Sequence, residues 1–161
     1  MAMRYIERLT ITPTINRYNP MINVFILNSL IVSITVMIHY EFLYRFSAWI
    51  PKMKIKHRFR IVVGVFAALI AHAVEIWIFA IAFYFMNHSE GWGQLIGNFD
   101  GDIWDCAYFS FTTFTTLGFG DIEPIGKLRY LTGIESLTGL VLITWTASFL
   151  FYEMQRHWNE K

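Results

Sequence analysis

The sequence predicts an all-α membrane protein, and three observations support this fold class. Apolar residues make up 55% of the 161 residues and charged residues only 16%, whereas a soluble domain carries about a quarter charged residues. Three apolar windows are long enough to cross a bilayer, which takes about 20 helical residues. The charges also separate by sign along the chain. Because Cys106 is the single cysteine, disulfide scaffolds and thiolate metal clusters are excluded.

The first predicted helix occupies residues 21–44, after an N-terminal segment of residues 1–20. Its apolar window, residues 21–39, follows Asn19 and Pro20, a cap-and-proline start signal. The window is longer than the apolar part of a signal peptide, and no small-residue cleavage site follows it. We therefore expect a retained spanning helix, and the alternative is a helix that lies along the interface or re-enters the bilayer. It carries no repeating arginines, so no voltage sensor is predicted.

The second and third predicted helices cover residues 61–86 and 127–152. Both are apolar around nearly their whole circumference, as helices that face lipid are. Residues 153–161 are then expected to form a short cytoplasmic tail, too short for a domain that binds nucleotide, Ca²⁺ or another regulatory ligand. The chain is predicted to be a multi-pass protein of the cell membrane, plasma or inner.

The charge distribution predicts the orientation of the three helices. The predicted basic loop, residues 45–60, has six Lys or Arg and no acid, whereas residues 87–126 hold six acids and no Lys or Arg. The positive-inside rule places the basic loop in the cytoplasm and the acidic stretch outside. Three spans then leave the N-terminus outside, although Arg4, Arg8 and Arg17 oppose an external N-terminus.

The acidic stretch contains the most informative sequence. Asp102 is predicted to cap a short helix over residues 103–115, with Asp105 as its reciprocal partner. The string Thr-Leu-Gly-Phe-Gly-Asp follows at residues 116–121. A Thr-x-Gly-Tyr/Phe-Gly-Asp string after a short helix, placed between two spanning helices, resembles the filter of the potassium channel family. The resemblance covers residues 104–124 and is closest to small prokaryotic channels of the two-transmembrane pore-domain superfamily.

This resemblance implies a passive potassium-selective channel whose pore domain covers residues 61–152, with residues 21–44 as an extra transmembrane helix. Within the pore domain, it implies an outer helix (61–86), a turret (87–102), a pore helix (103–115), a filter (116–121) and an inner helix (127–152). Because each chain carries one filter and a closed ring needs four, a homotetramer is expected.

The chemistry of a dehydrated K⁺ agrees with this resemblance. The ion needs oxygen ligands, which rings of backbone carbonyls from four chains supply. The expected ion-binding residues are Thr116, Leu117, Gly118, Phe119 and Gly120, with K⁺ at the carbonyls of the first four. Turning successive carbonyls to one side requires some left-handed backbone, which glycine adopts most easily. The Leu117 and Phe119 side chains are expected to pack behind the filter.

Asp121, Tyr108 and Thr112 are expected to support the filter. In many potassium channels a pore-helix carboxylate pairs with the filter aspartate, and Thr112 stands at its position, while Tyr108 stands at the position of a tryptophan. This departure leaves open which group holds Asp121, and Glu75 and Glu135 are the candidates.

One face of the third spanning helix is expected to line the cavity. Leu137, Val141, Thr144 and Ser148 follow at steps of four, three and four residues, which places them on one helical face. A face that changes from apolar to hydroxyl-bearing suits a water-filled cavity, but small residues also serve helix packing in membranes. Gly139 is a candidate bending point.

Among the ionisable residues of the predicted spanning helices, His72, Glu75 and Glu135 are candidates for a functional role. Such residues are costly in hydrocarbon and usually face the protein interior. They are candidates for pH sensing, which predicts activity that varies between about pH 5 and 8, and the alternative is a structural hydrogen-bonded cluster. His72 and Glu75 alone offer too few ligands for a metal ion.

The sequence predicts a channel rather than an enzyme, because no nucleophile–base pair or phosphate-binding loop is present. No cofactor is expected, and K⁺ is the permeant ion. The expected partners are further copies of the chain and the lipid bilayer, with no nucleic acid. A weakly selective cation channel of the same fold and a non-conducting accessory subunit of another channel are the alternatives.

Overall fold

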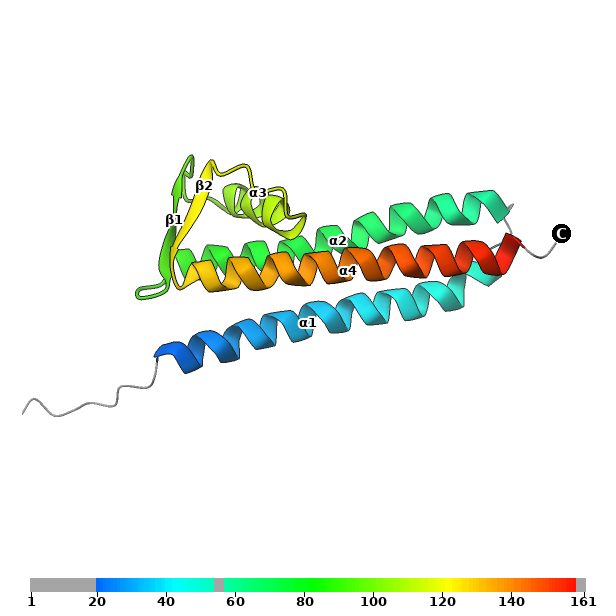
Figure 1. Cartoon of the computed structure of the whole chain (residues 1–161), viewed down its shortest axis with the longest axis horizontal. Coiled ribbons are helices and arrows are strands. Elements are labelled where there is room, and N and C mark those ends of the chain that lie inside the picture. Colours follow the sequence, from blue (N-terminus) through cyan, green and yellow to red (C-terminus); the bar gives the residue numbers. More distant parts are fainter. Residues whose placement is uncertain (1–19, 54–56, 159–161) are drawn as a thin grey trace, which may run out of the picture.

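The structure, a computed structural model, describes residues 20–53 and 57–158 (Figure 1). The predicted N-terminal segment therefore lies outside the described residues up to residue 19, as do Lys54 and Lys56 of the predicted basic loop. The described elements are α1 (Pro20–Trp49), η1 (Ile50–Lys52, a 3-10 turn), α2 (His57–Asn87), β1 (Gly93–Gly97), α3 (Ile103–Phe114), β2 (Ile122–Gly126) and α4 (Leu128–Trp158).

Three of these helices are long enough to cross a membrane. At 1.5 Å per residue, the 30 or 31 residues of α1, α2 and α4 extend about 45 Å. The helical spans of membrane-crossing length and composition are Met21–Lys52, which runs from α1 into η1, Phe59–Asn87 in α2 and Leu128–Arg156 in α4. The three predicted helices are confirmed as candidate membrane spans.

The predicted basic loop, residues 45–60, is shorter than expected because α1 and α2 both extend into it. In α1, the Arg45 guanidinium pairs with the Glu41 carboxylate one turn earlier, an arrangement that favours continued helix. Pro51 lies in η1, where its missing N–H and fixed φ end the α-helical hydrogen bonding.

The predicted tail is also corrected, because α4 continues past residue 152 as far as Trp158. Glu153 is buried, and Ser47 Oγ of α1 donates a hydrogen bond to its Oε1 at 3.3 Å. The contact with α1 gives this last part of α4 a packing partner, which stabilises helix beyond the apolar window.

A small antiparallel sheet corrects the all-α prediction. β1, within the predicted turret, pairs with β2, with Gly93 opposite Gly126 and Gly97 opposite Ile122. Gly93 and Gly97 have positive φ, and a Cβ atom at Gly93 would lie 2.1 Å from the Ile125 carbonyl oxygen. The close approach of the two strands therefore depends on glycine, and strands this short show no alternating apolar pattern that would predict them.

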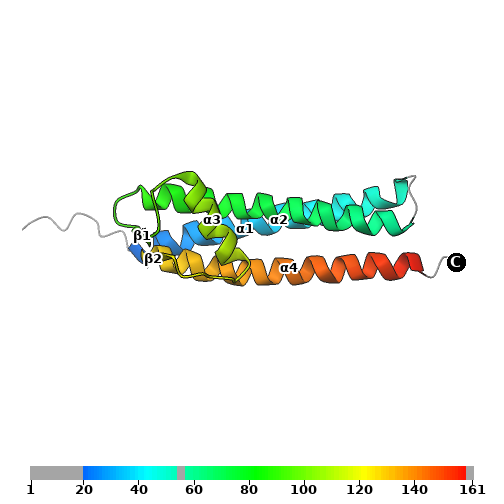
Figure 2. The same ribbon diagram turned by 90° about the horizontal axis from the view of Figure 1, so that it is seen from above.

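The core forms where α3 packs against α2 and α4. Its largest fully buried side chains include Phe79 and Phe83 of α2, Phe114 of α3, and Leu131 and Leu142 of α4. Figures 1 and 2 show α3 and the strands on one side of the α2–α4 pair and α1 on the other. The loop after α3 is therefore left uncovered by α1.

Candidate functional site

The site begins at α3, whose first turn is fixed by a side-chain cap. Asp102 Oδ1 accepts a hydrogen bond from the Asp105 N–H at 2.8 Å, as predicted. The reciprocal bond is not the one expected, because Asp105 Oδ2 accepts from the Asp100 N–H at 2.7 Å. Both carboxylates therefore satisfy backbone donors at or before the start of α3, where negative charge also favours the helix dipole.

The predicted filter, residues 116–121, follows α3 as a loop with alternating backbone conformation. Backbone φ is positive at Thr116 (59°), Gly118 (49°) and Gly120 (78°), so every second residue is left-handed. The glycine spacing predicted left-handed backbone at the two glycines, for which it carries no steric cost. At Thr116 the same backbone costs about 1–2 kcal/mol, and strain of this kind clusters at functional sites.

The end of α3 holds the start of this loop through the Thr112 carbonyl. The carbonyl oxygen accepts from the Leu117 N–H at 2.8 Å and from the Gly118 N–H at 3.1 Å. The Thr112 side chain is buried, and its hydroxyl donates to the Phe109 carbonyl within α3. Thr112 thus contacts the predicted filter through its backbone rather than its side chain.

Tyr108, rather than a glutamate, holds Asp121. The Tyr108 hydroxyl donates to Asp121 Oδ2 at 2.9 Å, which stabilises the neutral phenol and raises the pKa of Tyr108 above its ordinary value; burial and the nearby Asp121 charge act in the same direction. The Asp121 carbonyl also accepts from the Asn98 N–H at 2.8 Å. Glu75 bonds to His39 and His72, and Glu135 bonds to Ser110. Neither glutamate therefore holds Asp121, for which both were candidates.

The side chains of the predicted filter are open in the single chain. Leu117 is 57% exposed and Phe119 65%. The Phe119 ring stacks on Tyr108, with ring centroids 6.4 Å apart and an interplanar angle of 6°, so it has a partner within the chain. Leu117 keeps most of its surface uncovered, and the predicted packing of its side chain is not present within one chain.

Gly139 allows the end of α3 to lie directly against α4. A Cβ atom at this position would lie 2.1 Å from the Phe114 carbonyl oxygen. α4 is continuous through Gly139, and Gly139 is a point of close helix contact; its role as a bending point stays a prediction. Beside it, the Ser136 hydroxyl donates to the Thr113 carbonyl at 3.1 Å.

The predicted cavity-lining residues of α4 share one exposed face in the single chain: Leu137, Val141, Thr144 and Ser148. The Thr144 hydroxyl contacts the carbonyls of Leu140 and Val141, and the Ser148 hydroxyl donates to the Thr144 carbonyl. Their donors are thus used within the helix, and their oxygens remain free to accept from water.

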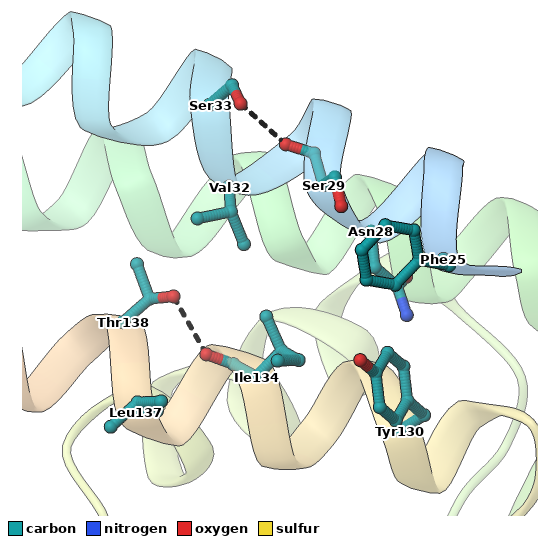
Figure 3. Close-up of a pocket in the computed structure, with 9 residues that line it drawn as sticks. All are labelled: Phe25, Asn28, Ser29, Val32, Ser33, Tyr130, Ile134, Leu137 and Thr138. Atoms are coloured by element: carbon teal, nitrogen blue, oxygen red, sulfur yellow. Dashed lines mark hydrogen bonds between the residues drawn. The ribbon is translucent and has the colours of Figure 1, made fainter.

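A mainly apolar pocket of about 310 Å³ lies beside this face, between α1 and α4 (Figure 3). Leu137 lines it together with Tyr130, Phe25 and Asn28. The Asn28 side chain is buried, and its amide has no hydrogen-bond partner within the described parts of the chain. The exposed α4 face is therefore bordered by α1 on the Leu137 side.

Two of the three ionisable residues predicted inside the helices lie together, with a third that the sequence analysis missed. Glu75 Oε1 lies 2.7 Å from His39 Nδ1 of α1, and Glu75 Oε2 lies 2.9 Å from His72 Nδ1. The His39 and Glu75 side chains are fully buried and that of His72 is 14% exposed. One ligand atom from each lies within 4.8 Å of the others. Among the described residues, these three therefore form a group that could hold a metal ion.

Glu135 is separate from that group and contacts α3. Ser110 Oγ lies 2.5 Å from Glu135 Oε1 and 2.8 Å from the Ile76 carbonyl oxygen. The serine hydroxyl has one proton, so both contacts are hydrogen bonds only when the Glu135 carboxyl carries a proton itself. Glu135 is fully buried behind the helix that precedes the predicted filter.

Comparison with known families gives one match. Residues 71–156, just over half of the chain, match a family described as "Ion channel". The matched region contains α3, the predicted filter, α4 as far as residue 156 and the second half of α2, and it excludes α1. No curated protein and no solved structure matches the chain.

Proposed function

Because the chain belongs to this ion channel family, we propose that it is a channel rather than an enzyme and that it forms a potassium-selective pore from four copies in the cell membrane. The observation that carries the proposal is the loop at residues 116–121, where left-handed backbone recurs at Thr116, Gly118 and Gly120. Backbone that alternates in this way can turn successive carbonyls toward one side, which coordination of a dehydrated ion requires.

In the proposed pore, K⁺ binds the backbone carbonyls of Thr116, Leu117, Gly118 and Phe119 and the Thr116 hydroxyl, with Gly120 completing the turn. One chain supplies one carbonyl to each ring of four, so a complete coordination shell needs four chains. The open Leu117 side chain and the exposed α4 face support this assembly, since neighbouring chains would cover the former and the latter would border the cavity.

The irregular backbone of the filter loop also favours assembly of several chains in the membrane. In hydrocarbon, irregular backbone such as the filter loop is tolerated only where protein buries it or where it lines a water-filled pore. The loop is exposed in one chain, so insertion of a single chain would leave irregular backbone facing lipid. Assembly around the loop removes that cost.

We also propose that pH modulation of the pore acts through Glu135. Its partner Ser110 belongs to α3, and α3 holds the filter through the Thr112 carbonyl. Loss of the Glu135 proton would leave one Ser110 contact without a hydrogen and place a charge behind the filter. The one carboxyl side chain of α2, that of Glu75, is bonded to His39 and His72. Within the described residues, the hydrogen-bond partner of Glu135 is Ser110.

Cation flux from liposomes that contain only this chain tests the proposed function. We expect K⁺ and Rb⁺ to permeate far better than Na⁺, and Ba²⁺ to block. Equal K⁺ and Na⁺ flux would favour a weakly selective channel, and no flux would favour an accessory subunit.

A pair of glycine variants connects the flux to the loop. Gly118→Ala should abolish conduction and leave the tetramer intact, because a Cβ atom disfavours the left-handed backbone that the filter requires. Gly91→Ala is the matched control, since Gly91 also has positive φ (81°) and open space around it but lies outside the loop. Retained selective flux in Gly118→Ala would show that this loop is not the filter.

A further inference from the structure

The group formed by His39, His72 and Glu75 has the composition of a metal site. We propose that these three residues bind one divalent transition-metal ion, with Zn²⁺ the ion that fits best, and that this ion fastens α1 to the ion channel domain. The inference does not rest on potassium selectivity, since binding would hold for any ion that the pore conducts.

The donor set agrees with zinc. Two imidazole nitrogens and one carboxylate oxygen form a His₂Glu set, which leaves one position of a tetrahedral ion for water or another ligand. Imidazole nitrogen also distinguishes this group from the oxygen-only sites that Ca²⁺ and Mg²⁺ prefer. His39 comes from α1, whereas His72 and Glu75 come from α2, so the set joins two successive helices through residues that lie up to 36 positions apart.

The geometry requires only small movements. Ligand atoms at about 2.0–2.2 Å from a tetrahedral zinc ion lie about 3.4 Å from one another. In the structure the three ligand atoms lie within 4.8 Å of one another, with both histidine Nδ1 atoms at 2.7–2.9 Å from a Glu75 oxygen. The three side chains already converge, so binding would require rotations of the rings and of the carboxylate that bring the ligand atoms to the zinc spacing.

The surroundings favour a cation. Glu75 is fully buried, and its described ion-pair partners are the two histidines. A carboxylate in a membrane interior needs a compensating charge, and with both imidazoles neutral the group carries one negative charge. A divalent ion supplies that charge and replaces the hydrogen-bond protons, so metal binding and imidazole protonation exclude each other.

A second contact orients the ligand from α1. His39 Nε2 lies 3.4 Å from the Thr146 Oγ1 of α4, on the side of the ring away from Glu75. A partner on the second ring nitrogen is the usual support for a metal-bound histidine. The 14% exposure of the His72 side chain leaves an edge of the site open to an entering ion.

Metal content of the purified full chain tests the proposal. The chain carries an affinity tag without histidines, is produced with added Zn²⁺, and is analysed by mass spectrometry for metal per chain. We expect about one Zn²⁺ per chain in the wild type and a loss of at least tenfold in His39→Ala, His72→Ala and Glu75→Gln. His88→Ala is the matched control, because His88 is an exposed histidine at the end of α2 and should keep the metal.

A measurement on the wild type alone covers variants that fail to fold. Co²⁺ added to metal-free protein should give the intense visible absorption of a tetrahedral ion, and equimolar Zn²⁺ should remove it. A wild-type chain that holds less than about a tenth of an ion and gives no such spectrum would overturn the proposal, as would metal content unchanged in all three variants. Either result can occur while K⁺ flux persists, so failure here is distinguishable from failure of the proposed channel function.

Discussion

The Tyr108 hydroxyl donates a hydrogen bond to the Asp121 carboxylate at 2.9 Å, and the Tyr108 ring stacks on Phe119. One residue of α3 thus contacts the last two side chains of the filter loop. The Thr112 carbonyl binds the N–H groups of Leu117 and Gly118 near the start of the loop. α3 therefore fixes the loop at both ends.

Tyr108→Phe should preserve conduction and shorten the time for which the pore stays conducting. The substitution removes the side-chain bond to Asp121 but keeps the ring that stacks on Phe119 and the Asn98 N–H bond to the Asp121 carbonyl, so this end of the loop is held less firmly. Single-channel recordings measure the open time, with Tyr130→Phe, an exposed tyrosine of α4, as the control. Open times equal to wild type would show that this bond does not hold the filter.

The raised pKa of Tyr108 also predicts how this bond responds to pH. An ordinary tyrosine loses its proton near pH 10, and the bond to Asp121 moves that loss to higher pH. The Tyr108 hydroxyl should therefore keep its proton at both pH 6 and pH 8, and the Tyr108→Phe effect on open time should be the same at these two pH values. An effect confined to one of these pH values would contradict this account of the bond.

Gly139→Ala should destabilise the protein, because the new methyl group would lie 2.1 Å from the Phe114 carbonyl oxygen. Overpacking of this kind costs about 1–3 kcal/mol, which thermal unfolding in detergent would show as a lower Tm. Gly133→Ala in the same helix is the control, since a Cβ atom there meets nothing within 4 Å. That variant should be as stable as wild type or slightly more stable, because alanine favours helix over glycine. An equal Tm for both variants would contradict the close contact of α3 with α4.

Glu135→Gln should flatten the pH dependence of conduction between about pH 5 and 8. A glutamine can donate to Ser110 Oγ as the protonated carboxyl does, and it cannot lose that proton. Conduction of the variant should therefore resemble the acidic form of the wild type at every pH. The control is Glu41→Gln, a carboxyl that is half exposed on α1 and paired with Arg45. An unchanged pH profile in Glu135→Gln would refute this role.

Cys106 should resist alkylation in the folded protein. The thiol is fully buried, and burial, with the charges of Asp105 and Asp102, raises its pKa to about 12. At pH 8 only about one thiol in ten thousand would then be ionised. Mass spectrometry after maleimide treatment should find unmodified native protein and complete labelling in denaturant. Rapid labelling of the native protein would contradict the packing of α3.

The sequence predicted what depends on local pattern. The apolar windows predicted α1, α2 and α4, and the Asp102 cap predicted the start of α3. The spacing of Gly118 and Gly120 predicted left-handed backbone in the loop. These features depend on neighbouring residues, which is why one sequence is enough to find them.

Features that depend on contacts between distant residues were not predicted. His39 lies 36 residues before Glu75, and the sequence analysis did not consider it, although an ionisable residue in an apolar window is itself a signal. The Gly139 contact with Phe114 and the pairing of β1 with β2 depend on how helices and strands approach one another. No short-range pattern records such approaches.

The reversal potential of currents through bilayers that contain only this chain tests the central claim most directly. With K⁺ on one side and Na⁺ on the other, the account predicts a large potential that follows the K⁺ gradient by about 59 mV per tenfold change in K⁺. A reversal potential that stays near zero when K⁺ is exchanged for Na⁺ would contradict the potassium-selective filter at residues 116–121.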